Sequence, residues 1–404
     1  MRYNNGMKDI SDVSFDTGVF GGAFDPVHNQ HVALMQSVIR ILKLRRLVVL
    51  PSGHAPHKRT GTSFEDRVSM LRLATAHIPE VVIDTMERDV AGLTYSSDML
   101  PIMAERYGDF VHIIGGDSMV NMDTWHLPEV VMRYPHAVVA RGEADAELLA
   151  AIDAAERRYH ADITLLPALP SLSSSDVRLF YRLGGVPLAS DLSQGAAAHD
   201  KNRYFPMQNG VCWDVHTYIR THRLYDEYAP ILCEVPRHIS SSRWAHTLEV
   251  ARMAVRLNVQ LHVPEDKVLT AALLHDCMKG AAHVYPAVPQ DCRQPAVVHA
   301  FNGAEEAAAR YGVTDEDILN AIRYHTTGRA AMSDLERLIY LADYCEASRT
   351  FAGADAVRQL ALSDFDRGFE MAVRMTHAHV DEVGGDICPL GEECYRYYCT
   401  QGQS

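Results

Sequence analysis

Two histidines three positions apart follow a glycine pair in the segment GVFGGAFDPVHNQHVALMQ, residues 18–36. The apolar run up to Gly21 and Gly22 predicts a strand, and the run from His28 predicts a helix, on which side chains three apart share a face. The unpaired N–H groups and positive dipole end of a helix start bind phosphate, and glycines let the backbone approach a nucleotide closely. A pair such as His28 and His31 is by itself more often a surface or metal-binding pair. The strand and glycine turn in front of it favour a phosphate site.

The second half of the chain carries imidazoles and carboxylates that together suit metal ions: His246, His275, Asp276, His299, His325 and Asp343. They fall on five predicted helices or their ends. His275 and Asp276 are adjacent, so on a helix they diverge by about 100°, which lets the carboxylate face inward between two ions while the imidazole binds one. A ligand set without thiolate suits iron, manganese or similar ions better than a structural zinc site. Any one of these histidines is as often a hydrogen-bonded core residue, so the prediction depends on the whole set.

The elements that must position the first group alternate between strands and helices. Short β-branched runs bounded by Gly, Pro or polar turns predict buried parallel strands at residues 18–24, 46–52, 81–86, 110–117, 136–141 and 162–168. Amphipathic stretches between them predict helices at residues 30–43, 64–77, 96–108 and 146–159. This repetition predicts a doubly wound, Rossmann-like α/β domain, with ligands beyond the carboxyl ends of its strands.

The elements that must position the second group are helical. Residues 184–210 are rich in Gly, Pro, Ala, Ser and Asn, which indicates a loop, and a helix is predicted directly after it at 211–225. Further helices are predicted at 241–258, 264–280, 300–312, 315–328, 334–348 and 363–380. We therefore expect an N-terminal extension at 1–17, an α/β domain at 18–225 and an all-α helical bundle at 226–404.

Composition narrows the class of protein. The chain has 404 residues, 47% hydrophobic and 22% charged, which is typical of globular domains and excludes disordered and fibrous classes. Its net charge of −14 gives no general electrostatic reason to bind nucleic acid or anionic membranes. No run approaches the roughly 18 apolar residues of a spanning helix, and residues 1–17 lack the apolar core of a secretory signal. We expect a cytoplasmic protein whose cysteines are thiols.

The histidine segment resembles the H-x-G-H signature of adenylyltransferases, and the motifs after it resemble nicotinate-mononucleotide adenylyltransferase in particular. These motifs are PHK ending at Lys58, TYSSD with Tyr95 and Ser96, HIIGGDSM with Gly115 and Asp117, then Trp125, and SSSDVR from Ser173 to Arg178. The resemblance covers about residues 18–225. One position departs from the family, because Gln30 stands where the signature has glycine.

The resemblance implies that ATP, accompanied by Mg²⁺, gives its adenylyl group to nicotinate mononucleotide. Such a transfer needs in-line positioning and charge neutralisation and no protein nucleophile. The donors implied for catalysis are His28, His31, Lys58 and Arg178. The residues implied for binding ATP are Gly21, Gly22, Phe24, Gly115, Asp117, Ser173, Ser174 and Ser175, and those for nicotinate mononucleotide are Tyr95, Ser96 and Trp125.

The segments RWAHT, LLHDCMK, VHAFNGA, AIRYHTTGR and LIYLADYCEASR resemble the HD-domain superfamily of metal-dependent phosphohydrolases over about residues 235–385. Within it, the bacterial symmetrical bis(5′-nucleosyl)-tetraphosphatases, which cut diadenosine tetraphosphate into two ADP, are the most similar. The resemblance implies that the six ligands hold two metal ions, with iron as the expected metal. It also implies catalytic roles for Asp276 and Lys279, with Arg329 and Arg349 as candidate substrate contacts.

The sequence leaves three alternatives open. The first half could be a degenerate nucleotide sensor that regulates the hydrolase, a reading that Gln30 makes worth testing. The HD half could act on another nucleotide, such as a nucleoside monophosphate or a guanosine alarmone. Pantetheine and nicotinamide-mononucleotide transferases share the histidine motif, so substrate choice depends on Tyr95 and Trp125. In each case the expected partners are small nucleotides, among them ATP, nicotinate mononucleotide and diadenosine tetraphosphate, and the oligomeric state stays open.

Overall fold

The computed structural model describes residues 15–53, 61–90, 92, 94–141, 146–169, 172–185, 210–351, 353–382 and 388–400. Lys58 and nearly all of the predicted 184–210 loop lie outside these residues, as does most of the predicted N-terminal extension. The described chain divides into two compact units, the first with residues 15–181 and 210–225, the second with residues 182–185 and 226–400. The sequence-based domain limits at 17/18 and 225/226 remain predictions about independently folding parts. Within the described ranges no helix is long and apolar enough to cross a membrane.

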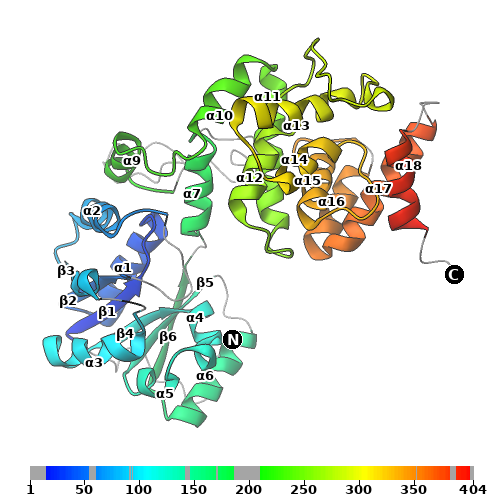
Figure 1. The fold of residues 1–404 in the computed structure, drawn as a ribbon. Coiled ribbons are helices and arrows are strands. Elements are labelled where there is room, and N and C mark those ends of the chain that lie inside the picture. Colours follow the sequence, from blue (N-terminus) through cyan, green and yellow to red (C-terminus); the bar gives the residue numbers. More distant parts are fainter. Residues whose placement is uncertain are drawn as a thin grey trace. The chain divides into compact units, whose positions relative to one another are not determined.

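The first unit is built on a six-stranded sheet with the order β3-β2-β1-β4-β5-β6 (Figure 1). Every neighbouring pair is parallel. The strands are β1 (Thr17–Gly22), β2 (Arg46–Pro51), β3 (Val81–Ile83), β4 (Val111–Gly115), β5 (His136–Arg141) and β6 (Ile163–Leu169). The predicted parallel α/β sheet is confirmed. Because the strand order reverses between β1 and β4, the fold provides a crevice at the carboxyl ends of these two strands.

Helices cover both faces of this sheet, since alternate strand residues point to opposite sides. Val49 and Ile113 belong to one core with α1, α2, α7 and α9, whereas Val48 and Ile114 belong to the other with α3, α4 and α6. The helical elements of the unit are α1 (Asn29–Leu42), α2 (Phe64–Thr75), η2 (Met86–Asp89), α3 (Ser96–Tyr107), α4 (Gly116–Val120), η3 (Met122–Thr124), α5 (Pro128–Val131), α6 (Ala146–Tyr159), α7 (Ser174–Arg182) and α9 (Trp213–Thr221).

The described secondary-structure elements of the second unit are all helical, as predicted. Its elements are α10 (Ala229–Glu234), η4 (Val235–Arg237), α11 (Ser241–Leu257), α12 (Glu265–Leu274), η5 (Gln290–Cys292), α13 (Val298–Tyr311), α14 (Glu316–Tyr324), α15 (Asp334–Cys345), α16 (Ala354–Ser363), α17 (Phe365–Glu382) and α18 (Pro389–Cys399). Helices α11, α12, α14 and α15 pack against one another. Helices α10, α16 and α18 are additions to the predicted set.

Several predicted helices are too long, and at two of them imidazole side chains explain where the helix ends. The helix predicted at 264–280 stops at Leu274, and the one predicted at 315–328 stops at Tyr324. In each case the next residue is a histidine whose Nδ1 donates to the backbone carbonyl three residues earlier, at 2.7 Å. These carbonyls belong to the last turn and lack an intrahelical partner. His275 and Asp276 therefore lie on the turn after α12, and the prediction that they share a helix is wrong.

Two buried histidines pair across β4 and β5 in the first unit. His112 Nδ1 lies 3.1 Å from His136 Nε2, and His136 Nδ1 lies 2.6 Å from the Tyr134 carbonyl oxygen. Since the carbonyl can only accept, His136 carries its proton on Nδ1 and accepts the His112 proton on Nε2. Burial lowers the pKa of both rings, that of His136 to about 4. The pair is therefore neutral near pH 7.

Because the buried pair of His112 and His136 resists protonation, we predict that the first unit loses stability as the pH falls from about 6.5 to about 4. In that window the unfolded chain binds a proton on each imidazole, whereas folded His136 does not until its lowered pKa of about 4. Above about pH 6.5 His136 does not reduce the free energy of unfolding. Between about pH 6.5 and about pH 4 its resistance to protonation lowers that free energy by about 3 kcal/mol. Urea unfolding of wild type and His136→Gln at about pH 7 and about pH 5 checks this. An equal loss of stability in both proteins would contradict it.

Candidate active sites

A cleft of about 920 Å³ lies in the first unit at the carboxyl ends of β1 and β4. It is lined by every predicted transferase residue that the structure describes, namely Gly21, Gly22, Phe24, His28, His31, Tyr95, Ser96, Gly115, Asp117, Trp125, Ser173, Ser174, Ser175 and Arg178. Lys58 lies outside the described residues. The fold thus brings segments more than 100 residues apart into one cleft, and the individual roles of these residues stay predictions.

The histidine pair begins α1 and is held in place by the backbone. His28 Nδ1 accepts from the His31 N–H at 3.4 Å, and His31 Nδ1 accepts from the His28 N–H at 3.3 Å, which forms a capping box. The two rings stack with centroids 3.7 Å apart. Because Nδ1 of each ring accepts, each neutral imidazole carries its proton on Nε2. The cleft is therefore provided with two N–H donors of the kind that phosphate accepts.

The carboxylate of Asp25, only 2% exposed, fixes the turn before these histidines. It accepts hydrogen bonds from Gly61 N at 2.6 Å, Thr62 Oγ1 at 2.6 Å and Tyr225 Oη at 2.7 Å. The guanidinium of Arg178 donates to the Asp25 carbonyl at 2.6 Å. This network joins the glycine turn to α2, α7 and the chain end of the unit. Asp25 was not among the residues predicted from the sequence, although an acid next to the turn proline was a signal for it.

We predict that removal of one donor to the Asp25 carboxylate lowers the stability of the first unit measurably. A hydrogen bond to a buried charged group is worth about 1.5–3 kcal/mol, so Tyr225→Phe should lower the free energy of unfolding of the first unit by that amount. Tyr218→Phe is the matched control, because Tyr218 Oη donates at 3.0 Å to Asp66, which is only partly buried, whereas Asp25 is fully buried. We expect less than about 1 kcal/mol there. Urea unfolding gives both values, and equal losses would contradict the assigned importance of Asp25.

Other residues along the cleft were not foreseen. The ring of His126 lies 4.5 Å from that of Tyr95, and its Nδ1 is 3.0 Å from Ser97 Oγ. Together with Trp125 these rings form an aromatic wall. Gln30, the departure from the glycine signature, also lines the cleft, and its Oε1 is buried without a hydrogen-bond partner among the described residues. The side chain is therefore accommodated without closing the cleft.

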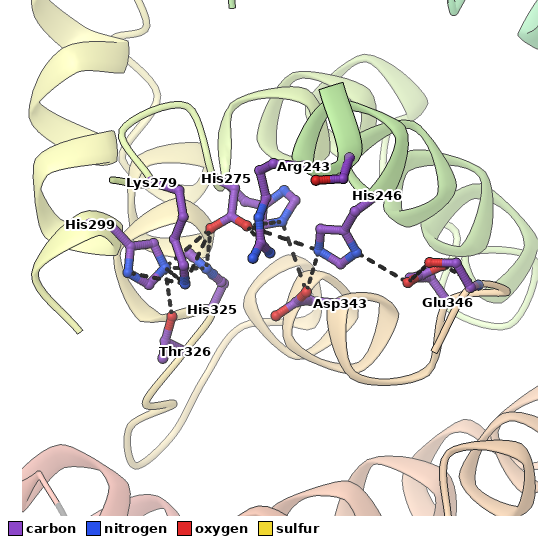
Figure 2. Close-up of polar contacts among 12 residues, drawn as sticks. Arg243, His246, His275, Lys279, His299, His325, Thr326, Asp343 and Glu346 are labelled. Atoms are coloured by element: carbon purple, nitrogen blue, oxygen red, sulfur yellow. Dashed lines mark hydrogen bonds and ion pairs between the residues drawn. The ribbon is translucent and has the colours of Figure 1, made fainter. Parts of the chain in front are cut away.

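Five of the six predicted metal ligands form two candidate ligand groups in the second unit, and the sixth, His299, lies against one of the five, Asp276; Figure 2 labels the four histidines and Asp343. Asp276 Oδ1 lies 3.1 Å from His299 Nε2 and 3.5 Å from His325 Nε2, whereas Asp276 Oδ2 faces His275 at 3.7 Å. The remaining two ligands form the other side, with His246 Nε2 2.8 Å from Asp343 Oδ1. Two groups of three have ligand atoms within 4.8 Å of one another, and His275 belongs to both: His246, His275 and Asp343, and His275, Asp276 and His325.

The chemistry of these side chains fits divalent cations. Burial lowers the pKa of His275 and His299 to about 4, so both rings are neutral and keep a lone pair for a metal. His275 Nε2 is buried and makes no hydrogen bond to any described residue. Burial opposes the charge of Asp276, yet the surrounding imidazoles outweigh it and hold its pKa well below the usual range. Neutral imidazoles around an ionised carboxylate are a donor set that binds divalent metal ions.

Cationic side chains surround the same cluster. Arg243 Nη1 lies 2.8 Å from Asp276 Oδ2, Lys279 Nζ lies 2.9 Å from His299 Nε2, and Arg349 Nη2 lies 2.7 Å from Asp343 Oδ1. Arg243 was missed in the sequence, although its place three residues before His246 puts both on one helix face. Arg329 behaves differently, since its guanidinium pairs with the Glu336 carboxylate at 2.7 Å and 3.0 Å. Its contact with substrate remains a prediction.

Both sites agree with the families that the chain matches. Residues 19–180 match the cytidylyltransferase-like family, and residues 243–348 match the HD domain. The class of protein is therefore a nucleotidyltransferase domain followed by an HD domain. By its first half the chain belongs to the nicotinate-nucleotide adenylyltransferase family, and by its second half to the symmetrical bis(5′-nucleosyl)-tetraphosphatase family. The two resemblances drawn from the sequence are confirmed.

Three relatives carry this assignment. A symmetrical bis(5′-nucleosyl)-tetraphosphatase of Bacillus subtilis is 37% identical over 165 residues, which are 38% of this chain and 88% of the relative. A probable nicotinate-nucleotide adenylyltransferase of Geobacter sulfurreducens is 35% identical over 178 residues, 43% of this chain and 81% of the relative. A Mycoplasma pneumoniae protein named probable nicotinate-nucleotide adenylyltransferase/Ap4A hydrolase is 25% identical over 371 residues, 88% of this chain and 97% of the relative.

Proposed function

We propose that this chain is a bifunctional enzyme. Its first unit joins nicotinate mononucleotide to ATP and releases pyrophosphate and nicotinic acid adenine dinucleotide, and its second unit hydrolyses diadenosine tetraphosphate to two ADP. The observation that carries the proposal is the convergence of each predicted residue set within its own unit, one around a cleft and one around a ligand cluster. The Mycoplasma pneumoniae relative, whose name combines both activities, spans 88% of the chain.

In the transferase site, catalysis requires that two phosphates meet in line and that their charge is neutralised. His28 and His31 supply Nε2 donors at the start of α1, and Arg178 lies on α7 at the same cleft. Ser173 caps α7, because its Oγ accepts from Asp176 N at 3.1 Å, and so the positive end of that helix also faces the cleft. We propose that these groups hold the transferring phosphate and the departing pyrophosphate. Mg²⁺ would arrive with ATP.

In the hydrolase site, a pair of bound metal ions supplies an activated water and polarises the phosphoryl oxygens. We propose iron for both positions. The side chains of the six ligands would hold the ions, and Asp276 contacts a member of each ligand group, His325 at 3.5 Å and His246 at 4.0 Å. Arg243, Lys279 and Arg349 border the cluster and can neutralise the phosphate chain as the bond breaks. Release of two ADP requires attack at a phosphorus of the central linkage, which places these cations beside the inner phosphates.

Product analysis with the full chain, purified without chelators, tests both reactions. With ATP and nicotinate mononucleotide we expect the dinucleotide and pyrophosphate in equal amounts, and with diadenosine tetraphosphate we expect ADP alone. No pyrophosphate would favour a nucleotide sensor in the first half, for which Gln30 is the reason. If the protein did not cleave the tetraphosphate but hydrolysed another nucleotide, that nucleotide would be the substrate of the second unit. Formation of ATP and AMP from the tetraphosphate would contradict symmetrical cleavage.

A further inference from the structure

The imidazoles of the metal cluster differ in what holds the ring nitrogen that faces away from it. In His275 and His325, Nδ1 donates to a backbone carbonyl at 2.7 Å. A carbonyl can only accept, so the proton stays on Nδ1 and Nε2 keeps its lone pair toward the cluster. In His246 the same nitrogen faces a side chain, because Nδ1 lies 3.1 Å from Glu346 Oε1 (Figure 2). A carboxylate here replaces the carbonyl found at His275 and His325.

Glu346 is itself firmly held. Its side chain is fully buried, at 0% exposure, and follows Asp343 by three residues at the end of α15. Oε1 accepts from Ser348 Oγ at 2.6 Å, and Oε2 accepts from Ser348 N at 2.5 Å. Arg358 donates to the Glu346 backbone carbonyl at 2.7 Å and so fixes the turn from α16. A buried carboxylate satisfied in this way has one position, and that position is against His246.

We propose that Glu346 is a positioning residue of the metal centre. It accepts the Nδ1 proton of His246 and directs Nε2 to the ion shared by His246, His275 and Asp343, an inference that rests on the metal centre of the proposed function. A carboxylate also makes the imidazole more basic than a carbonyl does, and loss of such an outer partner typically weakens metal binding about 10–100-fold. A residue that only stabilised the fold would lower the unfolding temperature and leave metal affinity unchanged.

Glu392 offers a matched control. Its Oε2 lies 2.9 Å from His377 Nε2 on α17, which is a more exposed carboxylate–imidazole pair that includes no predicted metal ligand. Glu392→Gln therefore repeats the chemical change of Glu346→Gln without touching a predicted ligand. Comparison of the two variants separates the loss of an imidazole partner in general from its loss at His246.

The experiment measures Mn²⁺ binding to the metal-stripped full chain by electron paramagnetic resonance, with circular dichroism to confirm folding. We expect wild type and Glu392→Gln to bind two ions alike, and Glu346→Gln to bind one of them about 10–100-fold more weakly. Equal affinities in all three folded proteins would overturn the inference. An equal weakening by both substitutions would overturn it as well.

Glu346→Asp keeps the test decisive if the glutamine variant does not fold. It retains the charge with a side chain one methylene shorter. We expect the ion held by His246, His275 and Asp343 to bind more weakly than in wild type. Wild-type affinity in the folded aspartate variant would contradict a positioning role. The measurement needs no nucleotide, so a wrong hydrolase substrate leaves its outcome intact. Failure of wild type to bind any Mn²⁺ would instead reject the metal centre, and this inference with it.

Discussion

Asp276→Asn should lower the rate of diadenosine tetraphosphate hydrolysis at least about 10³-fold and leave the transferase rate unchanged. The Asp276 carboxylate lies 3.5 Å from His325 Nε2 and 4.0 Å from His246 Nε2, so it contacts one member of each candidate ligand group. Loss of metal-based charge stabilisation raises the free energy of the transition state by several kcal/mol. An increase of about 4 kcal/mol lowers the rate by three orders of magnitude. Steady-state rates of ADP formation measure the effect.

The matched control for this change is Asp381→Asn, because Asp381 is an exposed residue of α17. We expect it to hydrolyse the tetraphosphate as wild type does. Metal analysis of the same preparations should show fewer bound ions in Asp276→Asn alone. A hydrolysis rate within about tenfold of wild type in that variant, which amounts to 1.36 kcal/mol, would exclude Asp276 as a metal ligand.

His31→Asn should lower kcat of the transferase about 10²–10³-fold, the usual effect of removing one donor from a charge-stabilising site. The asparagine oxygen can still accept the His28 N–H that His31 Nδ1 accepts at 3.3 Å, so the start of α1 is preserved. The substitution removes the Nε2 donor together with the ring that stacks on His28. Pyrophosphate release at saturating ATP and nicotinate mononucleotide measures kcat.

His160→Asn serves as the control for the histidine variant, since His160 is exposed in the same unit. It should match wild type in both reactions. If His31→Asn raised KM for ATP and left kcat intact, His31 would contribute only to binding of the ground state. That result would reject its proposed part in neutralising the transferring phosphate.

The sequence predicted the sheet well because buried parallel strands are nearly continuous apolar runs, as Arg46–Pro51 illustrates. It predicted the ends of α12 and α14 poorly. Those helices stop where His275 and His325 bond the preceding carbonyls, and a side-chain contact of this kind has no signature in hydrophobic periodicity. Short helices such as α10 were not predicted, because six residues span fewer than two turns and show too little of the helical period.

For the sites, residues inside a local motif were predicted and their distant supports were not. His28 and His31 are only three positions apart at a predicted helix start, and the structure brings them together with His28 as the N-cap of α1. Asp25 and Tyr225 are 200 positions apart, and His246 and Glu346 are 100 apart. A buried acid in a single sequence does not reveal which distant donor it meets, so the groups that hold each site in place required the fold.

The most direct test of two independent sites in one chain is to measure both reactions on the same preparations of wild type, Asp276→Asn and His31→Asn. The account predicts that Asp276→Asn loses tetraphosphate hydrolysis and keeps the transferase, whereas His31→Asn loses the transferase and keeps hydrolysis. Loss of both reactions in either folded variant, or of neither, would contradict it.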